Sequence, residues 1–184
     1  PTNLTQIGDY TFYECILLTN IEIPNKVTHI GEGAFVWCNK LINIRIPSSV
    51  QNIEENVFYG CTSLNSIQVD INNINYMDDN GVLYTKDKTQ LIKYPQAKNS
   101  TEYEVLEGTI SIENNAFLQN NILQNIIIPN GVINIGGRAF EDCTSLIEVE
   151  IGCGVNLIAN GAFWDCSSLT NIKIPKSVTT IEGI

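Results

Sequence analysis

The sequence has little positive charge. Its 184 residues include 10 Lys and Arg and 1 His against 20 Asp and Glu, for a net charge of −10 at pH 7. Nucleic-acid binding depends on clustered Lys and Arg that displace counterions from phosphates, and binding to an anionic membrane needs similar clusters. Long apolar runs are lacking too, because none approaches the roughly 20 residues of a membrane-spanning helix. We therefore expect no nucleic-acid partner and no membrane insertion within this chain.

Residues for catalysis and metal binding are also scarce. A zinc site needs about four converging ligands, usually in closely spaced pairs, whereas the cysteines are spread along the chain and His29 is its one histidine. A Cys–His nucleophile pair would need His29 beside a thiol, and we expect His29 to be a surface residue. The stretch DDNG at residues 78–81 resembles part of a calcium loop without its acidic spacing, so turn formation explains it better. We expect no enzyme activity, no metal and no cofactor.

What the sequence does contain is an internal repeat of 23 residues. Each copy starts with an isoleucine, and a seventh isoleucine follows the sixth copy: Ile7, Ile30, Ile53, Ile112, Ile135, Ile158 and Ile181. Position 6 is phenylalanine in every copy: Phe12, Phe35, Phe58, Phe117, Phe140 and Phe163. Position 12 is always leucine, and positions 15 and 17 are isoleucine or valine. Such a fixed pattern indicates stacked structural units of one kind.

Each copy changes its apolar period along its length. Positions 1, 5, 6 and 9 have helical spacing, which predicts a short turn of helix with one apolar face. Positions 15 and 17 alternate as in a half-buried strand, and a proline follows at position 18 in four copies. Because one coil cannot bury its apolar side chains alone, the coils must stack with parallel strands. The prediction is an α/β-type repeat solenoid, with a parallel sheet on one face and short helical turns on the other.

The copy at residues 30–52, IGEGAFVWCNKLINIRIPSSVQN, resembles a BspA-like leucine-rich repeat, and the resemblance covers essentially the whole chain. It implies a right-handed superhelix on the surface of a cell or outside it, often an adhesin that binds host or neighbouring-cell proteins, and no enzyme. We expect a single solenoid over residues 1–184 that belongs to a longer array, with further repeats of the same protein as neighbours. Its coils are expected to start at Ile7, Ile30, Ile53, Ile112, Ile135 and Ile158.

An interruption of 36 extra residues separates the third and fourth copies. EYEVLEGTISI at residues 102–112 aligns with NIEIPNKVTHI at residues 20–30, so Tyr103 and Val105 should form an extra strand. Before it, residues 82–84 and 91–94 predict a β-hairpin around a polar turn at Lys86, Asp87 and Lys88, inside an irregular coil at residues 70–111. We interpret this hairpin as a family-typical variant, and a binding projection is the alternative.

Position 9 of the repeat forms a ladder of small residues: Cys15, Cys38, Cys61, Asn120, Cys143 and Cys166, with Cys153 elsewhere. Cα atoms of neighbouring coils should be about 4.8 Å apart, within the range for disulfides, but parallel side chains strain the required dihedral angle. We interpret the ladder cysteines as free structural thiols, with disulfides as the alternative. Asn120 supports this interpretation, because Asn and Cys share modest size and the ability to bond to backbone carbonyls.

Positions 14 and 16 point outward from each strand and line the face that solenoids generally use for binding. The candidate protein-binding residues there are Glu22, Arg45, Gln68, Glu102, Glu104, Ile127, Glu148, Glu150 and Lys173. Two acidic pairs, Glu102/Glu104 and Glu148/Glu150, surround Ile127. This is either a solvated sheet face or an acidic contact patch for a basic protein segment. It lacks large aromatic anchors.

Our leading hypothesis is a non-enzymatic protein-binding module, extracellular or on the cell surface, that contacts its protein ligand through the strand face or the hairpin. The alternative is a structural scaffold component of a larger assembly, intracellular or particle-associated. No signal peptide is visible in this stretch, and the sequons at Asn3 and Asn99 only permit a secretory route. Free ladder thiols suit a reducing, cytoplasmic compartment, yet buried thiols also persist outside cells.

Overall fold

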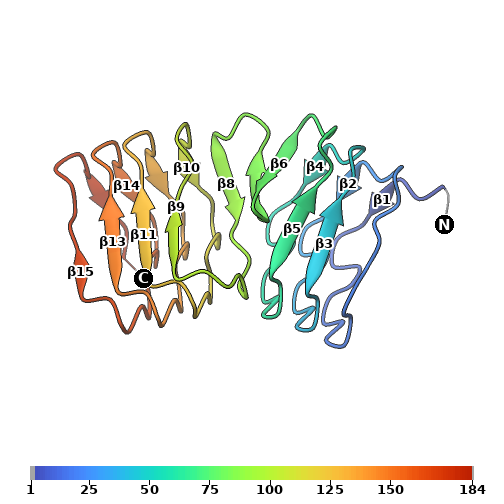
Figure 1. Ribbon diagram of the computed structural model, residues 1–184, viewed down its shortest axis with the longest axis horizontal. Helices are drawn as coiled ribbons and strands as arrows, with labels where there is room; N and C mark the ends of the chain where they lie inside the picture. The colour runs from blue at the N-terminus through green and yellow to red at the C-terminus, as the bar shows by residue number, and fades with distance from the viewer. Residues whose placement is uncertain (1–2, 184) are drawn as a thin grey trace. The chain divides into compact units, whose positions relative to one another are not determined.

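The chain consists of two compact units in the computed structural model, which describes residues 3–183 (Figure 1). The first unit ends at Asp87 and the second begins at Lys88. Both are built from short β-strands connected by turns, and each is described separately below.

The first unit contains two parallel sheets and one hairpin. One sheet has three strands in the order β1 (Gln6–Ile7), β2 (His29–Ile30) and β4 (Asn52–Ile53). The other sheet pairs β3 (Asn43–Ile46) with β5 (Ser66–Val69). The hairpin consists of antiparallel strands β6 (Tyr76–Asp79) and β7 (Val82–Thr85).

The second unit contains two larger groups of parallel strands. One group runs in the order β8 (Gln90–Lys93), β10 (Ser111–Ile112), β12 (Asn134–Ile135), β14 (Leu157–Ile158) and β16 (Thr180–Ile181). The other runs in the order β9 (Glu102–Glu104), β11 (Asn125–Ile128), β13 (Glu148–Ile151) and β15 (Asn171–Ile172). Strands β9, β11 and β13 carry five of the candidate binding residues: Glu102, Glu104, Ile127, Glu148 and Glu150.

The strand register follows the sequence repeat. His29 lies opposite Asn52, and Asn125 lies opposite Glu148, so equivalent residues 23 apart face each other across parallel strands. The parallel solenoid predicted from the repeat is therefore confirmed. Five of the six regular coils contribute two strands, whereas the sequence predicted only the one at positions 15 and 17. In the coil that starts at Ile7, the strand predicted at Ile21 and Ile23 does not form. The additional strand is formed by the first isoleucine of the repeat and the residue before it, as in His29–Ile30.

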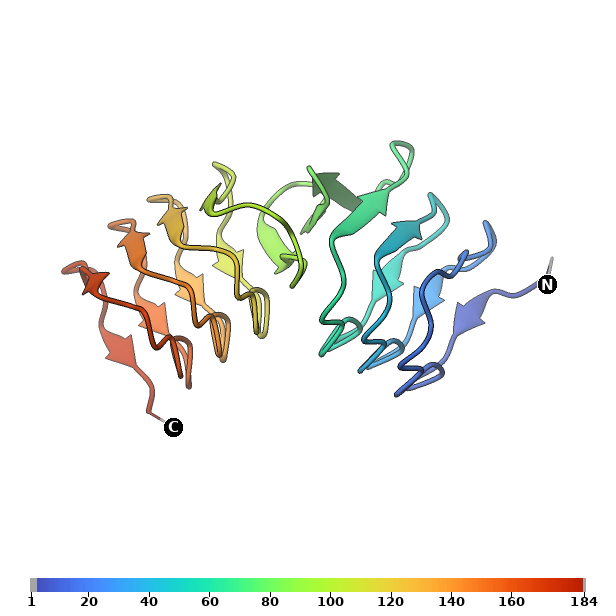
Figure 2. The ribbon, with the colours of Figure 1, turned by 60° about the horizontal axis from the view of Figure 1, so that its bottom comes forward.

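The short helical turns expected opposite the sheet do not form, so that part of the predicted fold is wrong. Within residues 3–183 there is no helix, and thus none that could cross a membrane. Positions 4 and 8 of every copy have positive φ, as in Gly33 (58°) and Trp37 (60°), and a left-handed residue interrupts an α-helix. Backbone N–H groups instead reach the next coil, as Phe35 N does to Val57 O at 3.0 Å. Consecutive tight turns replace the helix, and Figure 2 shows them one behind another within each unit.

The aromatic residues at position 6 form the centre of each core. In the first unit the Phe35 ring lies 5.3 Å from the Phe12 ring and 6.0 Å from the Phe58 ring. In the second unit Phe117 stacks on Phe140 at 4.6 Å and on Tyr94 at 4.8 Å. Tyr94 thus continues the phenylalanine row into the irregular coil. These stacks cross from coil to coil, so burial depends on neighbouring coils.

The interruption folds differently from its prediction in one respect. Both strands of the predicted hairpin form, as β7 and β8, and β8 pairs in parallel with β10. The tight antiparallel hairpin, however, joins β6 to β7, and β6 was not predicted from the sequence. Its turn residues Asn80 and Gly81 have φ of 49° and 86°, as a two-residue type I′ turn requires. The extra strand is confirmed as β9, with Tyr103 opposite Ile126.

Candidate protein-binding faces

The strand face of the second unit carries four glutamates around one isoleucine. Glu102 and Glu104 lie on β9, Glu148 and Glu150 lie on β13, and β11 runs between these strands. The register places Ile127 of β11 between Glu104 and Glu150. All five side chains are exposed, because buried or half-buried residues alternate with them along each strand. We call Glu102, Glu104, Ile127, Glu148 and Glu150 the acidic strand face.

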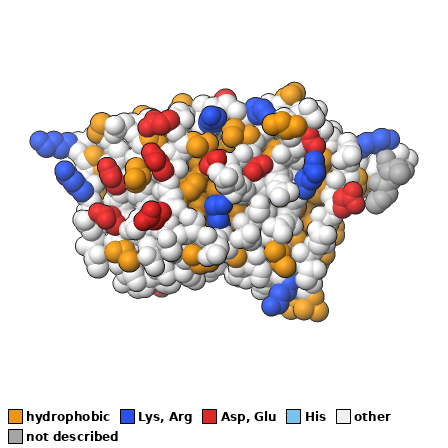
Figure 3. All heavy atoms as spheres, viewed as in Figure 1, with side chains coloured by type: hydrophobic (Ala, Val, Ile, Leu, Met, Phe, Trp, Pro, Cys, Tyr) orange, Lys and Arg blue, Asp and Glu red, His pale blue; other side chains and the backbone are white. Residues whose placement is uncertain are grey.

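None of these four carboxylates forms an ion pair with another described residue of the chain. Neighbouring parallel strands are about 4.8 Å apart, so Glu104 and Glu150 lie about 10 Å apart. Ile127 between them is 43% exposed. Acidic side chains gather over β9 and β13 in Figure 3. This arrangement suits a segment that carries basic residues on both sides of an apolar one.

The other four predicted residues of the strand face are Glu22, Arg45, Gln68 and Lys173. Lys173 is exposed directly after β15. In the first unit, Glu22, Arg45 and Gln68 line a polar groove of about 590 Å³. The Arg45 guanidinium pairs there with Asp70, with Nη2 and Oδ2 3.0 Å apart. Because this pair neutralises both charges, the groove attracts a charged partner less strongly than the acidic strand face does.

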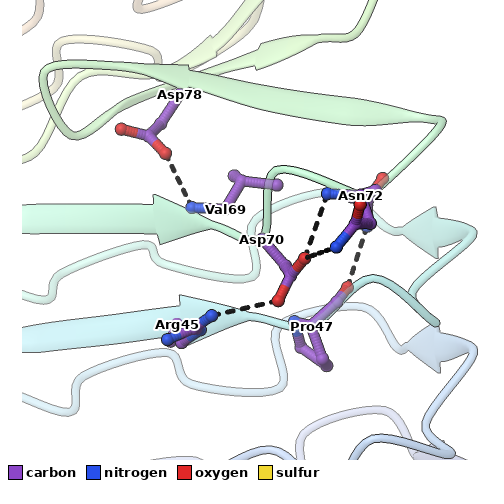
Figure 4. A network of polar contacts seen from close by, with 7 residues as sticks. Arg45, Pro47, Val69, Asp70, Asn72 and Asp78 are labelled. Atoms are coloured by element: carbon purple, nitrogen blue, oxygen red, sulfur yellow. Dashed lines mark hydrogen bonds and ion pairs between the residues drawn. The ribbon is translucent and has the colours of Figure 1, made fainter.

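Asp70 and Asp78 fix the backbone around the hairpin (Figure 4). Asp70 Oδ1 accepts a hydrogen bond from Asn72 N at 3.0 Å, and this bond together with the guanidinium described above lowers the pKa of Asp70. Asp78 accepts hydrogen bonds from Val69 N at 2.7 Å and from Gly81 N at 3.1 Å. In the DDNG stretch, the carboxylate of Asp78 therefore stabilises the turn. In the part of the chain that the structure describes, no group of three His, Cys, Asp or Glu residues could hold a metal ion.

Four of the ladder cysteines donate a hydrogen bond from the thiol to a backbone carbonyl of the preceding coil. Sγ lies 3.0–3.2 Å from the carbonyl oxygen of a phenylalanine 26 residues earlier, in the pairs Cys38–Phe12, Cys61–Phe35, Cys143–Phe117 and Cys166–Phe140. Cys15 is half-buried, and none of the six cysteines forms a disulfide. Burial raises the pKa of Cys143 to about 12 and that of Cys38 to about 11. At neutral pH the thiols of Cys38 and Cys143 therefore stay protonated and act as hydrogen-bond donors.

We expect six free thiols per chain, one of which reacts quickly. Ellman's reagent should detect all six in non-reduced protein denatured with guanidinium. In the folded protein, exposed Cys153 should react first, because the ladder thiols are buried or half-buried and less accessible to the reagent. Fewer than four thiols in the denatured, non-reduced protein would contradict the free-thiol interpretation.

Asn120 replaces cysteine where the preceding coil is irregular. Its Nδ2 donates to Pro95 O at 3.1 Å and to Gln96 O at 3.0 Å. Its Oδ1 accepts from Ile122 N at 3.1 Å and from Leu123 N at 2.8 Å. A thiol offers one weak donor and cannot serve these four backbone groups. The asparagine therefore matches the altered backbone of the coil before it.

Asn73 makes the same set of hydrogen bonds in the first unit, and this role was not predicted from the sequence. Its side chain is fully buried, and Nδ2 donates to Pro47 O at 2.9 Å and to Val50 O at 3.0 Å. Its Oδ1 accepts from Asn75 N at 2.9 Å and from Tyr76 N at 2.8 Å. Asn73 occupies position 21, which is valine in the other five copies. This single polar residue at an otherwise apolar position was the signal in the sequence that pointed to a different role for Asn73.

A family model covers nearly the whole chain. The model for the BspA type leucine rich repeat region matches residues 1–97 and 93–183, with six copies of the repeat. The sequence has no match among curated proteins.

Solved structures with a similar fold are bacterial leucine-rich repeat proteins. The pneumococcal vaccine antigen PcpA is 28% identical with a TM-score of 0.87, and the alignment covers 98% of this chain and 50% of that chain. A leucine rich cell surface protein from Faecalibacterium prausnitzii is 25% identical with a TM-score of 0.73, and 97% of this chain and 59% of that chain are covered. A leucine-rich repeat protein from Bacteroides capillosus is 28% identical with a TM-score of 0.53, over 59% of this chain and 88% of that chain. This chain thus spans less than two thirds of the length of the first two structures.

Proposed function

The chain belongs to the family of BspA-type leucine-rich repeat proteins, and on this basis we propose that it is an adhesin-like, protein-binding module at the cell surface or outside the cell. Stacked repeats offer long exposed faces that suit protein partners. The family match indicates no catalytic family. The proposed location draws support from the similar structure described as a cell surface protein.

We assign the protein partner to the acidic strand face. The observation that carries this assignment is the set of four glutamates around the exposed Ile127, none of which forms an ion pair with another described residue. Their charge would steer a basic segment toward the sheet, and the isoleucine would supply apolar contact on arrival. The matching partner is a protein segment with Lys or Arg on both sides of an aliphatic residue, on a host or neighbouring cell. Hairpin β6–β7 is the second candidate contact.

A bead-adhesion assay tests this function. Fluorescent beads coated with the chain should adhere to cultured epithelial cells several-fold more than beads coated with an unrelated acidic protein. Mild trypsin treatment of the cells should abolish the difference, because the proposed partner is a protein. Adhesion should also weaken as salt rises toward about 0.5 M, where charge attraction is screened beyond a few ångströms. Adhesion equal to the control, or adhesion that survives trypsin, would contradict the proposed function.

A further inference from the structure

The turns of the first unit carry surface aromatic rings that the strand face lacks. They come from equivalent segments of three consecutive coils, residues 8–14, 31–37 and 54–60. Tyr10 and Tyr13 are 48% and 46% exposed, and Trp37 and Tyr59 are half-buried. We call these four side chains the aromatic turn strip. They lie on the tight turns visible in the blue to cyan coils of Figure 2.

The rings are held against one another and against the backbone. Tyr10 and Tyr13 pack edge to face with centroids 6.1 Å apart, and Trp37 and Tyr59 do so at 5.5 Å. Trp37 also lies against Gly60 of the next coil, where a Cβ atom would come within 2.5 Å of the indole ring. The strip is therefore pre-organised, and a ligand would lose little additional side-chain freedom on binding it.

Carboxylates are interleaved with these rings, and cations are lacking. The three turn segments contain five acidic residues, Asp9, Glu14, Glu32, Glu54 and Glu55, and no Lys, Arg or His. All five are exposed, and the Tyr10 hydroxyl donates to Glu32 Oε1 at 2.6 Å. Aromatic faces and carboxylates both attract cations. The combination therefore favours a cationic ligand over a neutral or anionic one.

In the second unit, a cationic side chain packs on an aromatic ring within the turns. There, Arg138 lies over Trp164, with Cζ 5.9 Å from the ring centroid. The corresponding segments of that unit, residues 113–119, 136–142 and 159–165, contain no other Trp or Tyr. The one Trp or Tyr of these segments thus already has an arginine of the same chain. The rings of the first unit have no such arginine within their turn segments.

We infer that the aromatic turn strip is a second docking surface, which binds an arginine-bearing segment of a partner protein. It is separate from the acidic strand face and does not depend on the function proposed for that face. Guanidinium groups stack on aromatic rings and pair with carboxylates, whereas ammonium groups are more strongly hydrated and stack less. The strip therefore prefers arginine to lysine. Perpendicular ring pairs do not form the flat platform that would favour a sugar ring.

Two capped peptides, hexa-arginine and hexa-lysine, test this inference by calorimetric titration of the whole chain. Hexa-arginine should bind several-fold more tightly than hexa-lysine. Because exposed cation–π contacts contribute about 0.5–1 kcal/mol each, the double variant W37L/Y59L should weaken hexa-arginine binding about fivefold or more. It should also remove the preference over hexa-lysine. The matched control W164L should change the affinity less than twofold.

A second pair of variants tests the inference even if the double variant W37L/Y59L misfolds. If W37L/Y59L fails to fold by circular dichroism, E32Q/E55Q keeps the rings and should still weaken hexa-arginine binding, whereas E107Q/D165N removes two charges elsewhere and should not. Equal affinity for both peptides, or equal effects of the two charge pairs, would overturn the inference. In the W164F background, where Trp37 is the only tryptophan, a fluorescence response to maltoheptaose with none to hexa-arginine would overturn it in favour of a glycan.

Discussion

Replacing Asn120 by leucine should lower the free energy of unfolding by about 4 kcal/mol, because each buried backbone group left without a partner costs about 1–3 kcal/mol. Leucine has the same branched shape but neither donates nor accepts. The variant would leave Pro95 O and Gln96 O without their side-chain donor, and Ile122 N and Leu123 N without their acceptor. The Asn120 side chain is fully buried, so water cannot easily replace these bonds.

Urea denaturation monitored by circular dichroism measures this loss. Cys143→Ala is the matched control at the same repeat position, and it removes one weak thiol donor. We expect the control to cost about 1–2 kcal/mol, from the small cavity and the lost bond. Asn120→Cys installs the residue of the other coils and should still cost more than the control, since one thiol cannot serve four groups. If Asn120→Leu costs no more than Cys143→Ala, the bracing role assigned to Asn120 is wrong.

Replacing Phe117 by alanine should lower the free energy of unfolding by about 3–5 kcal/mol, the usual range for a buried Phe→Ala change. Phe117 is fully buried and stacks between Tyr94 and Phe140. Its loss leaves a cavity that the coils cannot close, because their backbones are tied together by hydrogen bonds such as Phe117 N to Ala139 O at 2.7 Å. Both neighbouring rings also lose their stacking partner.

Phe163→Ala is the control for this prediction. Phe163 occupies the same repeat position, but it is half-buried and stacks on Phe140 alone at 5.1 Å. Its replacement should cost about half as much, because less apolar area returns to water. Thermal or urea denaturation of both variants provides the comparison. Equal losses would show that the row of rings does not stabilise the fold through coil-to-coil stacking.

The repeat was sufficient to predict the stacked parallel strands. Apolar residues at positions 15 and 17 recur with the period of a half-buried strand, so both the strand and its neighbour 23 residues away could be predicted. The same alternation predicted that Glu104, Ile127 and Glu150 would be exposed. The binding role of these residues stays a prediction, as does a single continuous solenoid over residues 1–184.

The helical turn was predicted wrongly because the spacing of apolar residues does not determine the φ angles of the residues between them. Positions 1, 5, 6 and 9 match a helical face, but the residues between them decide the conformation. Position 4 is Gly or Asn in four of six copies: Gly33, Asn56, Asn115 and Gly161. These residue types tolerate positive φ, and position 4 indeed has it in every copy. The less uniform position 8, which includes Trp37 and Glu14, gave no comparable signal.

The missed hairpin and the missed aromatic turn strip have related causes. Asn80-Gly81 is a strong type I′ turn signal, but the strand before it, YMDD, lacks the β-branched pattern that marks a strand. Tyr10, Tyr13, Trp37 and Tyr59 occupy different positions of the repeat, so no periodicity connects them. Only the stacking of the coils brings them onto one surface.

The most direct test of the protein-binding account compares two charge-matched double variants in the bead-adhesion assay. E104Q/E150Q removes the glutamates on either side of Ile127, whereas E107Q/D165N removes two exposed charges outside the acidic strand face. At equal coating density, we expect E104Q/E150Q to reduce trypsin-sensitive adhesion at least fivefold and E107Q/D165N to leave it within twofold of the wild type. Equal adhesion of both variants would contradict the assignment of the partner to the acidic strand face.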